Sequence, residues 1–127
     1  MSEAEKTWLC SMSIKNISLA LLFCSNFAYS EVPTIQDYQS KNDSNTYESY
    51  IYGLESGLEW ANEYAFQKYS IEIFCKPRDL SLSLKQLNKI ISQEIQDNNR
   101  FYTKYKDAPL VGLALRNGFI SNYPCNK

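Results

Sequence analysis

The 127-residue sequence contains no histidine. Histidine is the most common general base and a frequent zinc ligand, so its absence excludes catalytic triads built on imidazole and most zinc sites. The four glycines do not form a phosphate-binding loop, and no serine lies in a nucleophile-elbow motif. Neither sign of charge dominates, because the chain has 13 basic and 14 acidic residues and a net charge of −1. This balance gives no support to a nucleic-acid-binding protein.

The apolar run near the N-terminus is too short to span a membrane. It covers residues 17–23 (ISLALLF), follows Lys15, and precedes small residues that end at Ser30. A membrane helix needs roughly 20 apolar residues, whereas this pattern is typical of a secretory signal peptide. We therefore predict a signal peptide over residues 1–30, cleaved after Ser30, with Met12 as an alternative start. The mature protein is expected in the periplasm and off the membrane; an uncleaved anchor is the alternative.

Four cysteines are present, and cleavage would leave two of them, Cys75 and Cys125. In an oxidising compartment these two can pair only with each other. Closing a loop of about 50 residues stabilises a chain by roughly 4 kcal/mol in the chain-entropy model. Such a bond is important for a mature chain of about 97 residues, which buries little surface on folding. Two reactive thiols or a metal pair are the alternatives.

Apolar residues recur at helical spacing in three segments of the chain. They predict helices over residues 46–69, from near residue 83 to residue 97, and from residues 107–109 to residue 122. The fold prediction is a small all-α bundle of three to five helices stapled by one disulfide. Residues 31–45 are polar and are expected to form a loose arm, which leaves residues 46–127 as the helical domain.

Capping residues precede each of the three predicted helices. Asn45 is placed to cap the first helix, and Glu48 follows it at nearly the spacing of a capping box. Ser83 and Gln86 form the capping-box pattern of the second helix. Asp107 is a plausible cap for the third.

Two groups of polar side chains are candidates for binding a partner. Glu55, Glu59 and Glu63 repeat every four residues and form a ridge on the first helix. A glycosidase needs two carboxyl groups that converge across a cleft, so we expect a solvated face instead of a catalytic site. The second group lies in residues 100–106 (RFYTKYK) and comprises Arg100, Tyr102, Lys104, Tyr105 and Lys106.

Three interpretations of residues 100–106 remain open. Tyrosine and arginine are frequent in binding hot spots, which favours a protein-binding loop. Basic and aromatic residues also interleave in platforms that stack single-stranded nucleic acid. The plainest interpretation is a helix extension with aromatic side chains in the core and lysines in water.

Gly53 and Gly57 lie inside the first predicted helix, where each costs about 1 kcal/mol relative to alanine. Their spacing puts both on one face, so another backbone can approach closely. Tight packing within one subunit is the preferred interpretation, and a homodimer contact is the alternative.

Charge is distributed unevenly along the chain. Residues 31–72 carry eight acidic and two basic residues, whereas residues 73–127 carry four acidic and nine basic residues. The two halves are expected to attract each other across the fold; steering of a charged partner is the alternative.

Three short motifs together resemble one known family. They are residues 50–58 (YIYGLESGL), residues 74–77 (FCKP) and residues 123–125 (YPC). The set is similar to the Rap/Tai family of immunity proteins of bacterial type VI secretion systems, over about residues 47–125. Of the family's residues, Cys75 and Cys125 match this sequence.

The resemblance implies a small, exported, all-helical protein that is often a homodimer and catalyses no reaction. Such a protein binds a toxin that degrades peptidoglycan and blocks the toxin's active-site cleft, and it needs no cofactor or metal. The expected partner is therefore a cognate cell-wall hydrolase. A small disulfide-bonded periplasmic chaperone or stress protein is the alternative function, and a hydrolase is the least favoured.

Overall fold

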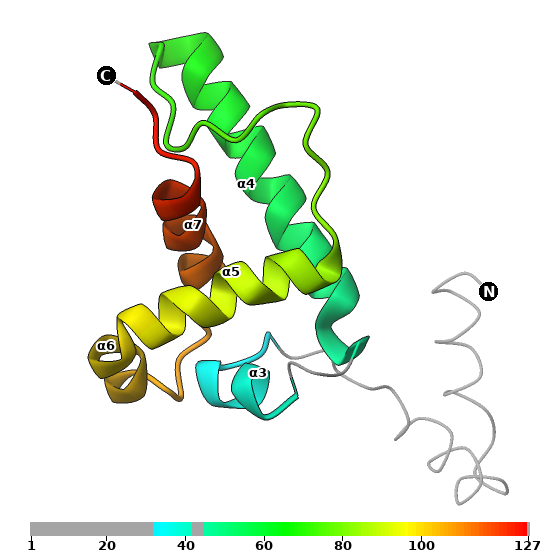
Figure 1. Ribbon diagram of the computed structural model, residues 1–127, viewed down its shortest axis with the longest axis vertical. Coiled ribbons are helices and arrows are strands. Elements are labelled where there is room, and N and C mark those ends of the chain that lie inside the picture. Colours follow the sequence, from blue (N-terminus) through cyan, green and yellow to red (C-terminus); the bar gives the residue numbers. More distant parts are fainter. Residues whose placement is uncertain (1–31, 42–44, 127) are drawn as a thin grey trace, which may run out of the picture. The chain divides into compact units, whose positions relative to one another are not determined.

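The computed structural model describes residues 32–41 and 45–126, which are helical throughout apart from connecting loops (Figure 1). The elements in chain order are α3 (Ile35–Lys41), the 3-10 helix η2 (Asn45–Tyr47), α4 (Glu48–Tyr69), α5 (Leu84–Asp97), α6 (Asn99–Lys104) and α7 (Val111–Asn122). This part of the chain contains no strand, so the all-α prediction is confirmed. The predicted signal peptide, residues 1–30, and the alternative start at Met12 lie outside the described residues.

Helices α5 and α7 pack most extensively against each other and form the centre of the core. Leu87 and Ile91 of α5 and Leu115 and Phe119 of α7 are fully buried. Gly118 makes this close contact possible, because a Cβ atom there would lie 2.4 Å from the Cγ2 atom of Ile90. None of the helices over residues 32–41 and 45–126 is long and apolar enough to cross a membrane.

The start and the end of α5 agree with the prediction. The backbone N–H of Gln86 donates to the Ser83 hydroxyl at 3.3 Å, and the backbone N–H of Ser83 donates to the Gln86 side-chain oxygen at 2.8 Å. This is the reciprocal capping box that the two residue types predict. The helix ends at Asp97.

The predicted starts of the other two helices are wrong by two or more residues. Asn45 lies in η2, and α4 begins at Glu48 after Tyr47, without a side-chain cap. Helix α7 begins at Val111 and also lacks a side-chain cap, so Asp107 does not cap it. Residues 106–108 contact α3 instead: the carbonyl oxygens of Lys106 and Ala108 accept the N–H groups of Gln36 and Ile35, at 2.9 and 3.1 Å.

The prediction of a loose arm over residues 31–45 is wrong for residues 32–41, which include α3. Ile35 and Tyr38 are buried, because their spacing gives this short helix one apolar side. The Tyr38 hydroxyl donates to the side-chain oxygen of Asn88 at 2.6 Å, and burial raises the pKa of Tyr38 to about 12. Thr34 and Asp37 exchange backbone-to-side-chain hydrogen bonds as a capping box does. The packed unit therefore begins at Val32.

Candidate functional site

A disulfide joins the segment after α4 to the segment after α7, as predicted. The sulfur atoms of Cys75 and Cys125 are 2.05 Å apart, and the Cα atoms are 4.9 Å apart. Next to this bond, the backbone N–H of Cys75 donates to the carbonyl oxygen of Tyr123 at 2.8 Å. The buried ring of Phe74 packs on Phe119, with ring centroids 5.1 Å apart. We call residues 70–77 the strap, since they run from the end of α4 to this staple.

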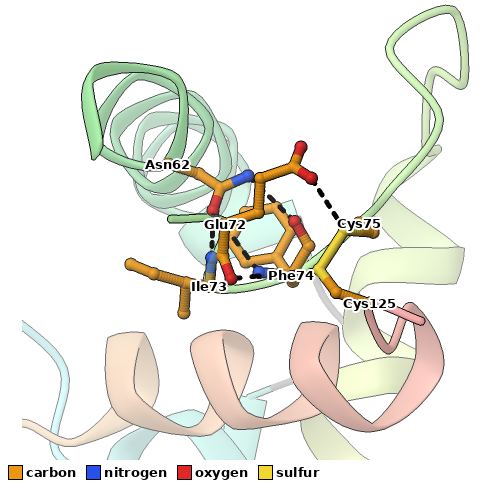
Figure 2. The surroundings of a disulfide bond; sticks show 6 residues. All are labelled: Asn62, Glu72, Ile73, Phe74, Cys75 and Cys125. Carbon is orange, nitrogen blue, oxygen red and sulfur yellow. Dashed lines mark hydrogen bonds between the residues drawn. A yellow bond between two sulfur atoms is a disulfide. The ribbon is translucent and has the colours of Figure 1, made fainter. Parts of the chain in front are cut away.

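Asn62 of α4 holds the strap by its side-chain amide (Figure 2). Its oxygen accepts the N–H of Ile73 at 2.6 Å and that of Phe74 at 3.4 Å, and its nitrogen donates to the carbonyl oxygen of Phe74 at 2.9 Å. Ser70, with a φ of 54°, ends α4 in the left-handed conformation and turns the chain into the strap. The sequence analysis missed Asn62, because only the folded chain brings its partners within reach.

Glu72 lies beside the disulfide, with a carboxylate oxygen 3.1 Å from the sulfur of Cys75 (Figure 2). A disulfide sulfur carries no hydrogen to donate, so the two atoms are in close contact but form no hydrogen bond. Glu72, Cys75 and Cys125 are the one group in the described part of the chain whose acidic or thiol atoms are near enough together for a metal ion. Metal binding by cysteine requires the thiolate, and both sulfurs are in the disulfide. The structure therefore contradicts the alternative of reactive thiols or a metal pair.

Lys76, directly after the disulfide, is buried against the acidic ridge of α4. Only 5% of its side chain is exposed, and its ammonium group lies 2.5 Å from a carboxylate oxygen of Glu59 and 3.9 Å from one of Glu55. It also donates to the carbonyl oxygen of Leu80 at 2.5 Å. Burial, followed by the charge of Glu59, raises the pKa of Glu55, and Lys76 partly offsets this. Lys76 therefore fixes the loop that leads from the strap to α5.

Arg78 pairs with the third glutamate of the ridge. Its guanidinium group lies 3.0 Å from the carboxylate of Glu63 and 5.8 Å from the ring centre of Phe66. The expectation of a solvated ridge is therefore wrong for Glu55, whose side chain is 12% exposed. Glu59 and Glu63 are 43% and 32% exposed, although they too face basic side chains of the following loop. Their proposed role in binding a partner stays a prediction, although each already has a cation beside it.

The structure divides the second candidate group, residues 100–106, into a core residue and surface residues. Tyr102 is 1% exposed, so it does not reach a partner. Burial and the neighbouring charge of Glu94 raise the pKa of Tyr102 to about 12. The remaining candidates are exposed: Arg100, Lys104, Tyr105 and Lys106. Lys106 donates to the side chain of Gln36 at 2.9 Å and so also supports α3.

Large apolar side chains are exposed at the end of α4 and on the strap. Tyr69 and Ile71 are 61% and 60% exposed, and Phe66 and Ile73 are about two-fifths exposed. We call these four residues the distal surface. Sequence analysis did not find it, because these positions lie outside the apolar stripe that predicted α4, and the strap was interpreted only as a connector.

Gly53 and Gly57 have open space where a side chain would be. No atom lies within 4 Å of a Cβ atom built at either position. The preferred interpretation, tight packing within one subunit, is therefore wrong. Trp60 and Tyr64 follow on the same face of α4 and are 75% and 58% exposed. A homodimer contact at this face stays a prediction.

Comparison with known proteins adds no relative: no family model matches this sequence, and no curated protein or solved structure is significantly similar to it. The candidate site is thus defined by the chain's own residues.

Proposed function

We propose that this protein is a periplasmic immunity protein that binds a peptidoglycan-degrading toxin of a type VI secretion system and blocks its active-site cleft. The observation that carries the proposal is the distal surface. Exposed apolar groups that gather on one part of a small protein commonly mark a protein-binding site, and aromatic side chains are enriched in such interfaces. The proposal assigns no catalytic step to the chain.

The way the strap is held supports a blocking role. Ile71 and Ile73 are on a segment fixed at one end by α4 and at the other by the disulfide. Between these ends, Asn62 binds the backbone of Ile73 and Phe74. Ordering a flexible segment on binding costs about 0.5–1.5 kcal/mol for each immobilised side chain. A strap that is already ordered avoids most of this cost and can enter a cleft without rearranging.

The nature of the partner rests on the resemblance to the Rap/Tai family. The FCKP motif of residues 74–77 supplies the first half of the disulfide, and the YPC motif of residues 123–125 supplies the second. Together with the predicted export signal, this resemblance is the support for a cell-wall hydrolase as the partner. A periplasmic chaperone would use exposed apolar surface as well, so the two functions require a direct test.

The proposal includes a homodimer formed by the glycine face of α4. Gly53 and Tyr64 lie at equal distances from the midpoint between residues 58 and 59, and so do Gly57 and Trp60. If two copies of α4 cross antiparallel about this point, Tyr64 of one copy meets Gly53 of the other, and Trp60 meets Gly57. Each exposed ring then has a side-chain-free position opposite it. A two-fold interface needs this kind of self-complementarity.

The test of toxin binding is periplasmic co-expression with the cell-wall hydrolase that the proposal expects to be encoded beside this gene. We expect cells to survive, and a stable complex to elute from a sizing column. Tyr69→Ala and Ile71→Asp are expected to weaken the complex by 2 kcal/mol or more each, about 30-fold in Kd, as central hot-spot residues do. Tyr105→Ala is the matched control, because it removes an exposed ring of residues 100–106.

Three outcomes would contradict the proposal. Lysis without a complex would exclude inhibition of this toxin. Loss of binding in Tyr105→Ala but not in Tyr69→Ala would move the contact from the distal surface to residues 100–106. Suppression of aggregation of unrelated proteins, with apolar dye binding that increases at low pH, would favour the chaperone.

A further inference from the structure

A groove of about 560 Å³ lies between α5, α6 and α7, and it shares no residue with the distal surface. Its lining includes Glu94 and Asn98 of α5 and its C-cap, Phe101 of α6, and Leu113, Arg116 and Asn117 of α7. The volume is within the range of about 300–1,000 Å³ that is usual for ligand sites.

Glu94 is a buried carboxylate in this groove whose hydrogen-bond partners are all neutral. It is 8% exposed. One of its oxygens, Oε1, accepts from the Tyr102 hydroxyl at 3.1 Å, from the Asn98 amide at 3.1 Å and from the Asn117 amide at 3.4 Å. None of these bonds goes to Oε2. Buried carboxylates are normally paired with a cation, yet Glu94 forms no ion pair with the lysines and arginines of residues 32–41 and 45–126.

Arg116 lines the same groove but is bound elsewhere. Its Nε and Nη2 atoms donate to the side-chain oxygen of Asn117 at 3.2 and 3.0 Å. The side chain of Asn117 therefore bonds both residues: its amide nitrogen donates to Glu94, and its oxygen accepts from Arg116. Glu94 therefore has no direct cation partner, and none of its three hydrogen bonds uses Oε2 at the wall of this groove.

We propose that this groove binds an arginine side chain of a partner protein, with its guanidinium group on the carboxylate of Glu94. Arginine is more weakly hydrated than lysine, so it loses less hydration on contact with a carboxylate, and its donors can reach the Oε2 atom that the three bonds leave unused. Phe101 and Leu113 form an apolar part of the groove wall. The alkyl part of a long basic side chain packs on such a surface. Glu94 is also in the last turn of α5, where the helix carbonyls add negative potential.

The exposed basic residues near the groove do not cancel this attraction. Opposite charges in direct contact at a protein surface attract each other more strongly than charges that are separated by water. Arg100 and Lys104 are exposed, and charges in water are screened over about 8 Å at physiological ionic strength. Arg116 is exposed as well, and its guanidinium group is held on Asn117. Direct contact with Glu94 therefore outweighs repulsion from these three side chains. The inference does not depend on the proposed toxin partner.

The test is a titration of the oxidised, ¹⁵N-labelled protein with two small probes. N-acetyl-arginine methylamide carries the guanidinium group, and N-acetyl-citrulline methylamide has nearly the same shape without the charge. We expect the arginine probe to shift the side-chain amide signals of Asn98 and Asn117 and to bind at least tenfold more tightly than citrulline, a difference of about 1.4 kcal/mol.

Two variants locate the binding site. Glu94→Gln keeps an oxygen for the three donors and is expected to lose the preference for arginine over citrulline. Glu63→Gln, on the ridge of α4, is the matched control and is expected to keep it. Equal binding of the two probes to the unaltered protein would overturn the proposal even if Glu94→Gln does not fold. Unchanged discrimination in a folded Glu94→Gln protein would overturn it as well.

Discussion

Replacing Lys76 with methionine tests how the loop between the strap and α5 is held on α4. Methionine keeps the apolar stem and removes the ammonium group. In the folded protein this group lies 2.5 Å from Glu59, 2.5 Å from the carbonyl oxygen of Leu80 and 3.9 Å from Glu55. The side chain of Glu55 is only 12% exposed. In the variant, the Glu55 carboxylate and the Leu80 carbonyl group lose their cation, and little water can reach them to replace it.

The size of the effect follows from the exposure of each partner. Removing one member of a buried ion pair costs about 3–5 kcal/mol, because the remaining charge stays buried and unpaired. Glu59 is 43% exposed and can be rehydrated, so its share is small. Most of the loss therefore comes from Glu55 and from the Leu80 carbonyl group. We expect a decrease of about 3 kcal/mol in the free energy of unfolding, at the lower end of that range.

Urea unfolding followed by circular dichroism measures this change. The midpoint should fall while the m-value stays the same, since the surface exposed on unfolding is nearly unchanged. The melting temperature should fall by roughly 12–24 °C for a domain of this size. Arg78→Met is the matched control, because Arg78 is 70% exposed and pairs with Glu63 at 3.0 Å; its loss should stay below about 1 kcal/mol. Equal losses in the two variants would refute the argument that burial makes the difference.

Two further predictions concern the ridge of α4 and the contact between α5 and α7. Glu55→Gln should stabilise the protein at pH 7 and have little effect near about pH 3, because burial raises the pKa of Glu55. Below the unfolded-state pKa of Glu55 its carboxyl group is neutral, and the protein keeps its full stability. This stability is lost as pH rises through the higher folded-state pKa, where the buried group becomes charged. Urea midpoints of both proteins across this pH range check the sign. Gly118→Ala should lose about 1–3 kcal/mol, since its methyl group would lie 2.4 Å from the Cγ2 atom of Ile90. Gly53→Ala, with open space around it, should gain about 0.5–1 kcal/mol in a dilute monomer, and thermal melts of the two variants compare them directly; a gain for Gly118→Ala would contradict the packing argument.

The features that sequence predicted correctly depend on neighbours along the chain. The capping box of Ser83 and Gln86 needs only a spacing of three residues and a free helix start. The buried side of α5 follows from apolar residues at helical spacing, and its end follows from the polar residues after Asp97. The disulfide between Cys75 and Cys125, 50 positions apart, is the exception: it was predicted from the number of cysteines and the expected export, which leave one pairing.

The features that were missed depend on contacts between distant segments. Tyr38 is buried with its hydroxyl group on Asn88, 50 positions away. Asn62 holds the strap because Ser70 reverses the chain and returns Ile73 to the side of α4. Neither residue belongs to a local sequence motif from which these partners could be predicted. A polar residue within a helix, such as Asn62, can equally face solvent, so its type alone does not identify its role.

Within residues 32–41 and 45–126, the ion pairs seen between the acidic and the basic half of the chain lie at α4. Lys76 and Arg78 of the basic half pair with the ridge of the acidic half at distances of 2.5–3.9 Å. Within the described residues, the other basic side chains of α5, α6 and α7 form no ion pair, and these are Lys85, Lys89, Arg100, Lys104 and Arg116. Attraction between the halves therefore fixes the loop after the strap and leaves the basic charge of three helices in solvent. That charge is free to increase the association rate with an acidic partner, an effect that salt would reduce.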